Sequence, residues 1–266
     1  MVLSCSKEAN VKLPDSKSLP VLYSYISPTD TMIRLKLLYS LPIYDTHQMD
    51  MLAAVSDADV KITSAQGTAQ LLFNPTTEYY ELNASLYPII PGQGYKITVV
   101  TIKGDVATAE TEVPAAIVPI NTIAVEAISG DYEISDRIKI SFIDEPGIAN
   151  QYRFGVLYSS VNNSQTDTIT TDTYINELYS DVNNDGGNVS LAGLYYQGYY
   201  SDTASSAAFY DIFLFNCSPS YFNFHKSISK YAGEDPFSEP ALIYTNVEGG
   251  FGCFGAYTSS VQRYQK

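Results

Sequence analysis

The sequence predicts an all-β protein of two β-sandwich-like units, with one short helix in the C-terminal unit. Apolar and polar residues alternate from Val21 onward, as Ile33 and Leu35 do with Arg34 and Lys36, which is the period of a half-buried strand. Clusters of Gly, Pro, Asn and Asp separate these segments at short intervals, as turns between strands do. Because 266 residues exceed what a single hydrophobic core usually serves, we expect two units of roughly 100 to 150 residues.

The first unit is predicted over residues 13–116 as an immunoglobulin-like or fibronectin-like sandwich. Turns at residues 64–67 and 103–105 each lie between two alternating segments, so both predict antiparallel hairpins. Pro114 ends the last of these segments, which is punctuation common in such sandwiches. A linker around Pro119 follows.

The second unit is predicted over residues 120–266. Residues 159–193 are rich in Ser, Thr, Asn, Asp and Gly with little periodicity, which favours a long loop. Residues 209–217 are apolar on both faces, as in a central strand. Ser-Pro then predicts a helix start, and apolar residues at helical spacing place the helix near residues 219–231. A further alternating strand is expected over residues 241–247.

Composition and charge exclude several classes of protein. Apolar residues make up 45% of the chain and charged residues 17%, which is enough to bury a core. The formal net charge of −14 repels phosphate backbones, so nucleic acid is not an expected partner. No run of about 18 apolar residues is present to span a bilayer as a helix. Any membrane attachment would therefore be through a lipid anchor only.

The N-terminus has features of a membrane tether. Val2-Leu3-Ser4-Cys5 resembles the end of a bacterial lipoprotein signal, in which the cysteine is lipidated. Residues 6–12 are polar and lack apolar periodicity. We therefore expect residues 1–12 to be a lipoprotein tether, and the missing apolar segment upstream leaves the lipidation of Cys5 open.

A candidate calcium loop lies within the predicted long loop. Residues 181–186 read DVNNDG, the first half of a pattern in which alternate oxygen-bearing side chains converge on the ion. The candidate ligands are Asp181, Asn183 and Asp185. Ala192 stands where the pattern requires a bidentate glutamate. Weak calcium binding and an ordinary Asn/Asp-rich turn are therefore both compatible with the sequence, and no other cofactor is expected.

Two tyrosine pairs in one short segment form a candidate contact surface. A tyrosine ring is apolar while its hydroxyl is polar, which suits ligand or partner contacts, although the same residues also pack at the rim of a sheet. The candidate contact residues are Tyr195, Tyr196, Tyr199 and Tyr200.

Two cysteines, Cys217 and Cys253, lie in the second unit. Outside the cytoplasm they could form a disulfide. The alternative is a pair of buried free thiols.

Catalytic groups are scarce. His47 and His225 are the only histidines, and neither lies in a nucleophile motif such as G-x-S-x-G. A carboxylate-based enzyme has only the abundance of acids in its favour, and acids are usually solvated surface. We therefore expect a protein without enzymatic activity.

The chain resembles the domain-of-unknown-function 4249 family of outer-membrane lipoproteins of Bacteroidetes, which are encoded beside TonB-dependent receptors. The resemblance covers nearly the whole chain. Its matching residues are Cys5, the turn at residues 91–95, Glu112-Val113-Pro114, the helix near Tyr221 and the Gly- and aromatic-rich block at residues 236–257.

The resemblance implies a lipid-anchored outer-membrane protein, on the cell-surface or the periplasmic face. It also implies an accessory or ligand-binding role beside a TonB-dependent receptor, and it supplies no catalytic residues. The alternative is a cell-surface adhesion or scaffold protein. The ligand and the oligomeric state stay open at this point.

Overall fold

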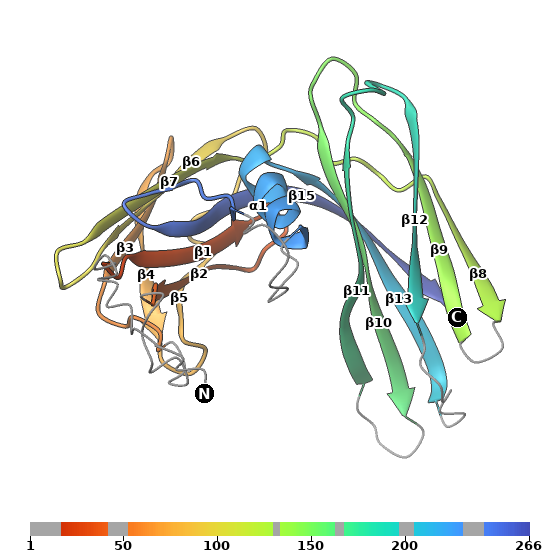
Figure 1. Ribbon diagram of the computed structural model, residues 1–266, viewed down its shortest axis with the longest axis horizontal. Helices are drawn as coiled ribbons and strands as arrows, with labels where there is room; N and C mark the ends of the chain where they lie inside the picture. The colour runs from red at the N-terminus through yellow and green to blue at the C-terminus, as the bar shows by residue number, and fades with distance from the viewer. Residues whose placement is uncertain (1–16, 42–52, 130–133, 163–167, 197–204, 231–241) are drawn as a thin grey trace, which may run out of the picture.

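The computed structural model describes residues 17–41, 53–129, 134–162, 168–196, 205–230 and 242–266. Strands dominate this part of the chain, and its one helix is short, so the predicted all-β class with one helix is confirmed. The strands form two lobes that meet at an angle (Figure 1). None of the described helical segments is long and apolar enough to cross a membrane.

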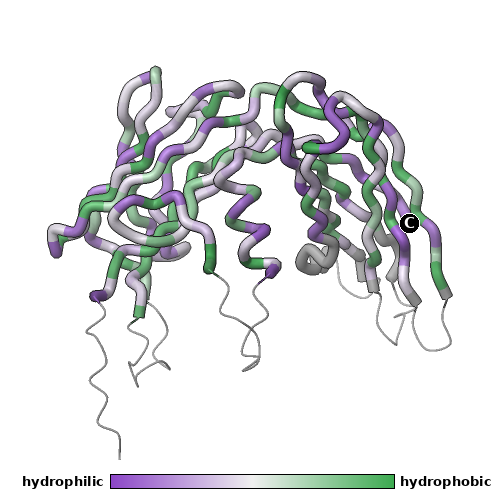
Figure 2. The backbone as a smooth tube through the Cα atoms, turned by 45° about the horizontal axis from the view of Figure 1, so that its top comes forward, coloured by the Kyte–Doolittle hydropathy of each residue, from purple (hydrophilic) through white to green (hydrophobic). Residues whose placement is uncertain are grey.

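The N-terminal lobe is a strongly curled sheet wrapped around its own core. Its strands are β1 (Pro20–Ile26), β2 (Met32–Tyr39), β3 (Asp59–Ser64), β4 (Gly67–Asn74), β5 (Tyr79–Asn83), β6 (Gly94–Val100), β7 (Val106–Glu112) and the short β14 (Val247–Glu248). Alternate residues of each strand point inward, so Ile33, Leu35, Val60 and Ile97 are fully buried. Figure 2 shows the resulting alternation of hydrophobic and hydrophilic residues along the backbone.

The C-terminal lobe packs two sheets face to face. The smaller sheet has the order β12 (Asn188–Tyr196), β9 (Ile134–Ile143) and β8 (Thr122–Ser129). The facing layer contains β11 (Thr168–Ser180), β10 (Gln151–Asn162) and β13 (Ser205–Cys217). Between the two layers lie the buried side chains of Ile140, Phe142, Phe154, Tyr210 and their neighbours.

The last strand, β15 (Phe251–Gln265), belongs to both lobes. Its first six residues pair in parallel with β1, from Val21 opposite Phe251 to Ile26 opposite Ala256. Its remaining residues pair antiparallel with β13. One continuous twelve-stranded sheet therefore runs through the described part of the molecule, in the order β11-β10-β13-β15-β1-β2-β5-β4-β3-β6-β7-β14.

The helix α1 (Pro219–Ser229) lies on β15 at the junction of the lobes (Figure 1). Ser218 is its N-cap, because the Ser218 hydroxyl accepts a hydrogen bond from the Tyr221 backbone N–H at 3.3 Å. Pro219 follows at the first turn, where a missing N–H costs nothing. The predicted helix near residues 219–231 is thus confirmed.

The predicted long loop at residues 159–193 is wrong, because most of it is strand. It contains the end of β10, all of β11 and the first part of β12. Thr, Ile and Tyr are frequent in β11, and these residues favour strands even where the segment is polar. Since β11 is the edge of its sheet, it pairs only with β10 and shows little apolar alternation.

The strand expected over residues 241–247 is also wrong for residues 242–246, since only Val247 and Glu248 pair with β7. Side-chain hydrogen bonds replace the ladder there. The Asn246 side chain bonds the carbonyl oxygens of Glu110 and Phe254 and the N–H of Phe254. Leu242, outside any strand ladder, is 94% exposed.

The boundary between the two hydrophobic cores agrees only in part with the predicted linker. The first core uses residues as far as Val113, and the second begins at Val118. However, Val247, Phe254 and Ala256 pack into the first core. The predicted second unit at residues 120–266 therefore supplies part of the N-terminal lobe.

Gly252 permits the close approach of β15 to β1. Its φ is +108°, and an added Cβ would lie 1.9 Å from the carbonyl oxygen of Leu22. Gly67 has a similar φ of +110° in the β3–β4 turn, but an added Cβ there would meet nothing within 4 Å. A substitution at Gly67 therefore introduces backbone strain alone, whereas one at Gly252 introduces backbone strain and a steric clash.

We predict that Gly252→Ala lowers the free energy of unfolding much more than Gly67→Ala does. Gly67→Ala should cost about 1–2 kcal/mol from the left-handed backbone alone. Gly252→Ala adds a backbone clash and should cost about 1–3 kcal/mol more, as overpacking does. Urea unfolding of both variants measures the difference, and equal losses would contradict the role assigned to Gly252.

Candidate functional site

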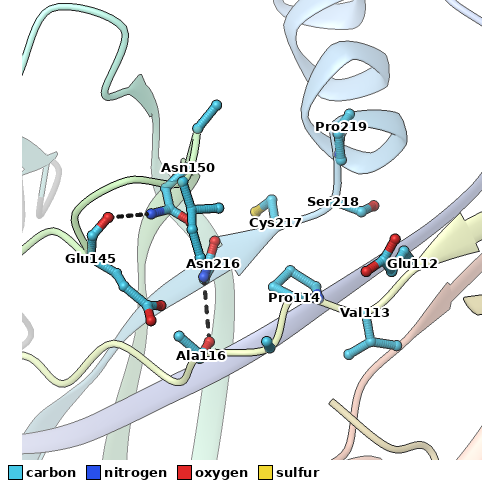
Figure 3. Close-up of a pocket in the computed structure, with 13 residues that line it drawn as sticks. Glu112, Val113, Pro114, Ala116, Glu145, Asn150, Asn216, Cys217, Ser218 and Pro219 are labelled. Atoms are coloured by element: carbon cyan, nitrogen blue, oxygen red, sulfur yellow. Dashed lines mark hydrogen bonds between the residues drawn. The ribbon is translucent and has the colours of Figure 1, made fainter. Parts of the chain in front are cut away.

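A pocket of about 230 Å³ lies where the two lobes meet (Figure 3). Residues 112–116 contribute its wall from the end of β7 and the linker. The β9–β10 loop contributes residues 145 and 148–150, and the passage from β13 into α1 contributes residues 216–219. Both lobes therefore build the pocket, and the continuous sheet fixes their relation.

Hydrogen bonds hold the linker wall in place. The carbonyl oxygen of Ala116 accepts from the Asn216 amide at 3.3 Å and from the Thr258 hydroxyl at 2.5 Å. These donors come from β13 and β15 respectively, so the linker is tied to both strands.

The Ser218 hydroxyl holds the helix wall. Besides capping α1, it accepts from the Ala256 N–H at 3.0 Å and from the Thr111 hydroxyl at 3.1 Å. The Ser218 N–H also donates to the Ala256 carbonyl oxygen at 2.8 Å. One small side chain thereby joins β7, β15 and α1 beside the pocket.

Three carboxylates gather behind the β9–β10 loop. One oxygen from each of Asp144, Asp181 and Asp185 lies within 4.8 Å of the others. Asp144 is 1% and Asp181 2% exposed, whereas Asp185 is at the surface. Such convergent carboxylate oxygens are the ligands that Ca²⁺ prefers.

The two inner carboxylates also organise the loop. Asp144 accepts from the Tyr152 hydroxyl at 2.5 Å and the Gly186 N–H at 2.8 Å. Burial and this bond to Asp144 raise the pKa of Tyr152. Asp181 accepts from the Asn150 N–H at 2.7 Å.

Asn150 connects this acidic cluster to the pocket. Its side-chain amide donates to the Asp144 carboxylate at 3.3 Å and to the Glu145 carbonyl oxygen at 3.0 Å. Because Asn150 also lines the pocket, the cluster and the pocket share one loop.

The structure brings together Asp181 and Asp185 of the predicted calcium loop, and Asn183 between them is exposed. Asp144 joins these two carboxylates from a different loop. Sequence reasoning missed it because its partners lie far along the chain. Its available signal was the Asp-Glu-Pro-Gly turn directly after an alternating strand.

The predicted tyrosine contact surface is not supported at Tyr195. That residue is 6% exposed and packs in the second core, with its ring 5.0 Å from Tyr158 and 5.5 Å from Tyr210. It points inward because odd-numbered residues of β12 face the core. The side chain of Tyr196 lies outside the described residues, as do Tyr199, Tyr200 and Cys5.

Cys217 and Cys253 are buried free thiols, so the alternative of a disulfide is wrong. Cys217 lies opposite Tyr257 in the β13–β15 ladder. Cys253 is four residues earlier on β15, or roughly 13 Å along the strand, whereas bonded cysteines need Cα atoms within about 7 Å. Burial raises the pKa of both thiols, that of Cys253 to about 12.

His225 lies on α1 among aromatic rings, at 4.4 Å from Tyr221 and 5.4 Å from Tyr25 between ring centroids. Its Nε2 is buried and has no hydrogen-bond partner among the described residues. Burial, together with the charge of Arg153, lowers its pKa to about 4. This environment is structural. His47 lies outside the described residues.

We predict that His225 stays neutral down to about pH 4. Since its pKa is below the usual value of about 6.5, the folded state binds fewer protons, and this contribution to stability is lost as the pH falls from about 6.5 to 4. An NMR pH titration of the imidazole resonances measures this directly, with His225→Gln providing the assignment. Titration near pH 6.5 would contradict the buried position.

Comparisons with known proteins identify a family but not an activity. A search of curated proteins found no significant match. Among solved structures, a mutant of Salmonella alpha-2-macroglobulin aligns with 10% identity and a TM-score of 0.25, covering 96% of this chain but 15% of the other. The family model described as "Domain of unknown function (DUF4249)" matches residues 6–263. The chain therefore belongs to the DUF4249 family.

Proposed function

We propose that the protein is a non-enzymatic, lipid-anchored accessory of a TonB-dependent receptor at the outer membrane, anchored through Cys5. The observation that carries the proposal is the family match across residues 6–263. Members of the DUF4249 family are encoded beside such receptors. The lipobox-like Ser4-Cys5 and the polar residues after it support the anchor.

The geometry of the junction supports binding rather than catalysis. The polar side chains of Asn216, Ser218 and Asn150, which line the pocket, form hydrogen bonds with backbone groups and hold them in place. A preformed pocket between firmly joined elements is the usual form of a binding site. It offers a partner one fixed surface contributed by both lobes.

We predict that solubilising the native outer membrane in mild detergent recovers this protein together with a TonB-dependent receptor in stoichiometric amounts. A Cys5→Ala variant should leave the membrane fraction because its lipid anchor is gone, while Ser6→Ala should behave as the wild type. Mass spectrometry of the purified material identifies the receptor and the lipid.

A lipidated protein recovered alone would favour the alternative, an adhesion or scaffold module. An unlipidated protein would contradict the proposed localisation.

The acidic cluster supports a second, smaller proposal, weak calcium binding by Asp144, Asp181 and Asp185. Extracellular-type sites with few carboxylates have dissociation constants of about 10⁻⁴ to 10⁻³ M. Two of the three carboxylates are buried and so are held in position before the ion arrives.

Calorimetric titration with calcium should show one weak site per chain. Asp185→Asn should weaken it about tenfold or more, because a negative ligand is lost while the buried carboxylates keep their hydrogen bonds. Asp57→Asn, which removes an exposed carboxylate in the N-terminal lobe, is the matched control and should bind normally. Absence of heat at millimolar calcium in the wild type would rule out the site.

A further inference from the structure

The interlobe pocket, defined by residues 112–116, 145, 148–150 and 216–219, presents hydrogen-bond acceptors. The Asn216 amide nitrogen donates to the Ala116 carbonyl oxygen at 3.3 Å. The Asn150 amide nitrogen donates to the Glu145 carbonyl oxygen and to the Asp144 carboxylate. These partners only accept hydrogen bonds, so the orientation of both amides is fixed. No described residue donates to either Oδ1, and both oxygens are left for a ligand.

The other side-chain donors around the pocket also have acceptors within the protein. The Ser218 oxygen accepts hydrogen bonds from the helix cap and from β15, and its own O–H lies 3.0 Å from the Ser220 hydroxyl oxygen, which can accept it. The Cys217 thiol points to the Phe215 carbonyl oxygen at 3.7 Å. Pro114 and Pro219 have no N–H at all. The side chains of the pocket therefore favour a ligand that donates hydrogen bonds.

Two carboxylates add negative charge to this acceptor surface. Glu112 comes from the N-terminal lobe and Glu145 from the C-terminal lobe, and they lie on opposite sides of the pocket in Figure 3. Neither forms an ion pair within the described chain, whereas the neighbouring Glu110 is paired with Lys96 at 2.9 Å. A positive group entering the pocket would meet two carboxylates that no described cation neutralises.

The remaining walls are apolar and the space is small. Pro114, Ile148, Ala149 and Pro219 supply surface that an alkyl chain can cover. At about 230 Å³ the pocket is smaller than the roughly 300 to 1,000 Å³ of sites for drug-sized ligands. Its size suits one extended side chain.

We propose that this pocket binds an alkyl ammonium or guanidinium group, and that the natural occupant is a lysine or arginine side chain of the partner protein. The cationic head lies between Glu112 and Glu145 and donates to the asparagine oxygens, while its alkyl stem covers the prolines and Ile148. The net charge of −14 favours approach of a cationic partner surface. The proposal deepens the proposed function and rests on it for the existence of a partner.

The test is an NMR titration of the isolated protein with n-butylammonium and n-butylguanidinium, with butyrate as the anionic control. We expect chemical-shift changes confined to the pocket for both cations and none for butyrate. Glu112→Gln and Glu145→Gln should each weaken binding up to about fivefold, as loss of a solvent-accessible charge contact does. Glu126→Gln removes the same charge from an exposed position on β8 and should change nothing.

Equal binding of butyrate, or unchanged affinity in both pocket variants, would overturn the proposal. A capped Gly-Lys-Gly peptide distinguishes a protein side chain from a free amine, and binding weaker than that of n-butylammonium would overturn the protein source.

Failure of this proposal is separable from failure of the proposed function. If the receptor is recovered equally with wild type and with a Glu112→Gln/Glu145→Gln variant, the pocket is overturned as its contact while the accessory role stands. If the cations bind but no receptor is recovered, the pocket stands and the accessory role does not.

Discussion

The pairing of β15 with both β1 and β13 is the constraint on which the rest of the structure depends. A parallel pair such as β1 with β15 cannot come from a hairpin, and here the connection between its strands is nearly the whole chain. The same strand then continues as the antiparallel neighbour of β13. Separating the lobes would require breaking this backbone ladder, so they are joined more firmly than by a linker alone.

Backbone proximity at β15 explains its unusual sequence. Gly252 admits the Leu22 carbonyl oxygen, and Gly255 admits α1, since a Cβ there would lie 2.9 Å from the Cβ of Tyr221. Aromatic residues between and after the glycines fill the space on either side, as Phe254 does in the first core. The described part of the Gly- and aromatic-rich block, residues 242–257, therefore contributes to packing at the lobe junction.

The position of the pocket follows from the same strand. Thr258 and Ala256 of β15 fix the linker and the start of α1, which form two of its walls. The third wall, the β9–β10 loop, is fixed from behind by Asp144 and Asp181. A pocket made of loops is thus held by the sheet and by a buried polar network, and such preorganisation would lower the entropic cost of binding the proposed ligand.

Local sequence signals are sufficient to predict the fold class but not the contacts between residues far apart in the chain. The alternation of Ile33 and Leu35 and the Ser218-Pro219 helix start act between near neighbours, and the structure agrees with both. The pairing of β1 with β15 and the approach of Asp144 to Asp181 join residues far apart in sequence, which leave no local pattern.

Polar strands such as β11 lack a local signal for a related reason, because β11 is stabilised by its neighbour β10 and not by its own periodicity.

Negative charge at the lobe junction is distributed over two adjoining sites. Asn150 bonds Asp144 and Asp181 and also lines the pocket. A cation bound by the acidic cluster would lower the negative potential acting on the pocket and compete for Asp144 with the Asn150 amide. The Glu145 carbonyl oxygen would still hold the amide at 3.0 Å, so the two sites would influence each other through charge. Positive charge bound at one proposed site would therefore oppose positive charge at the other.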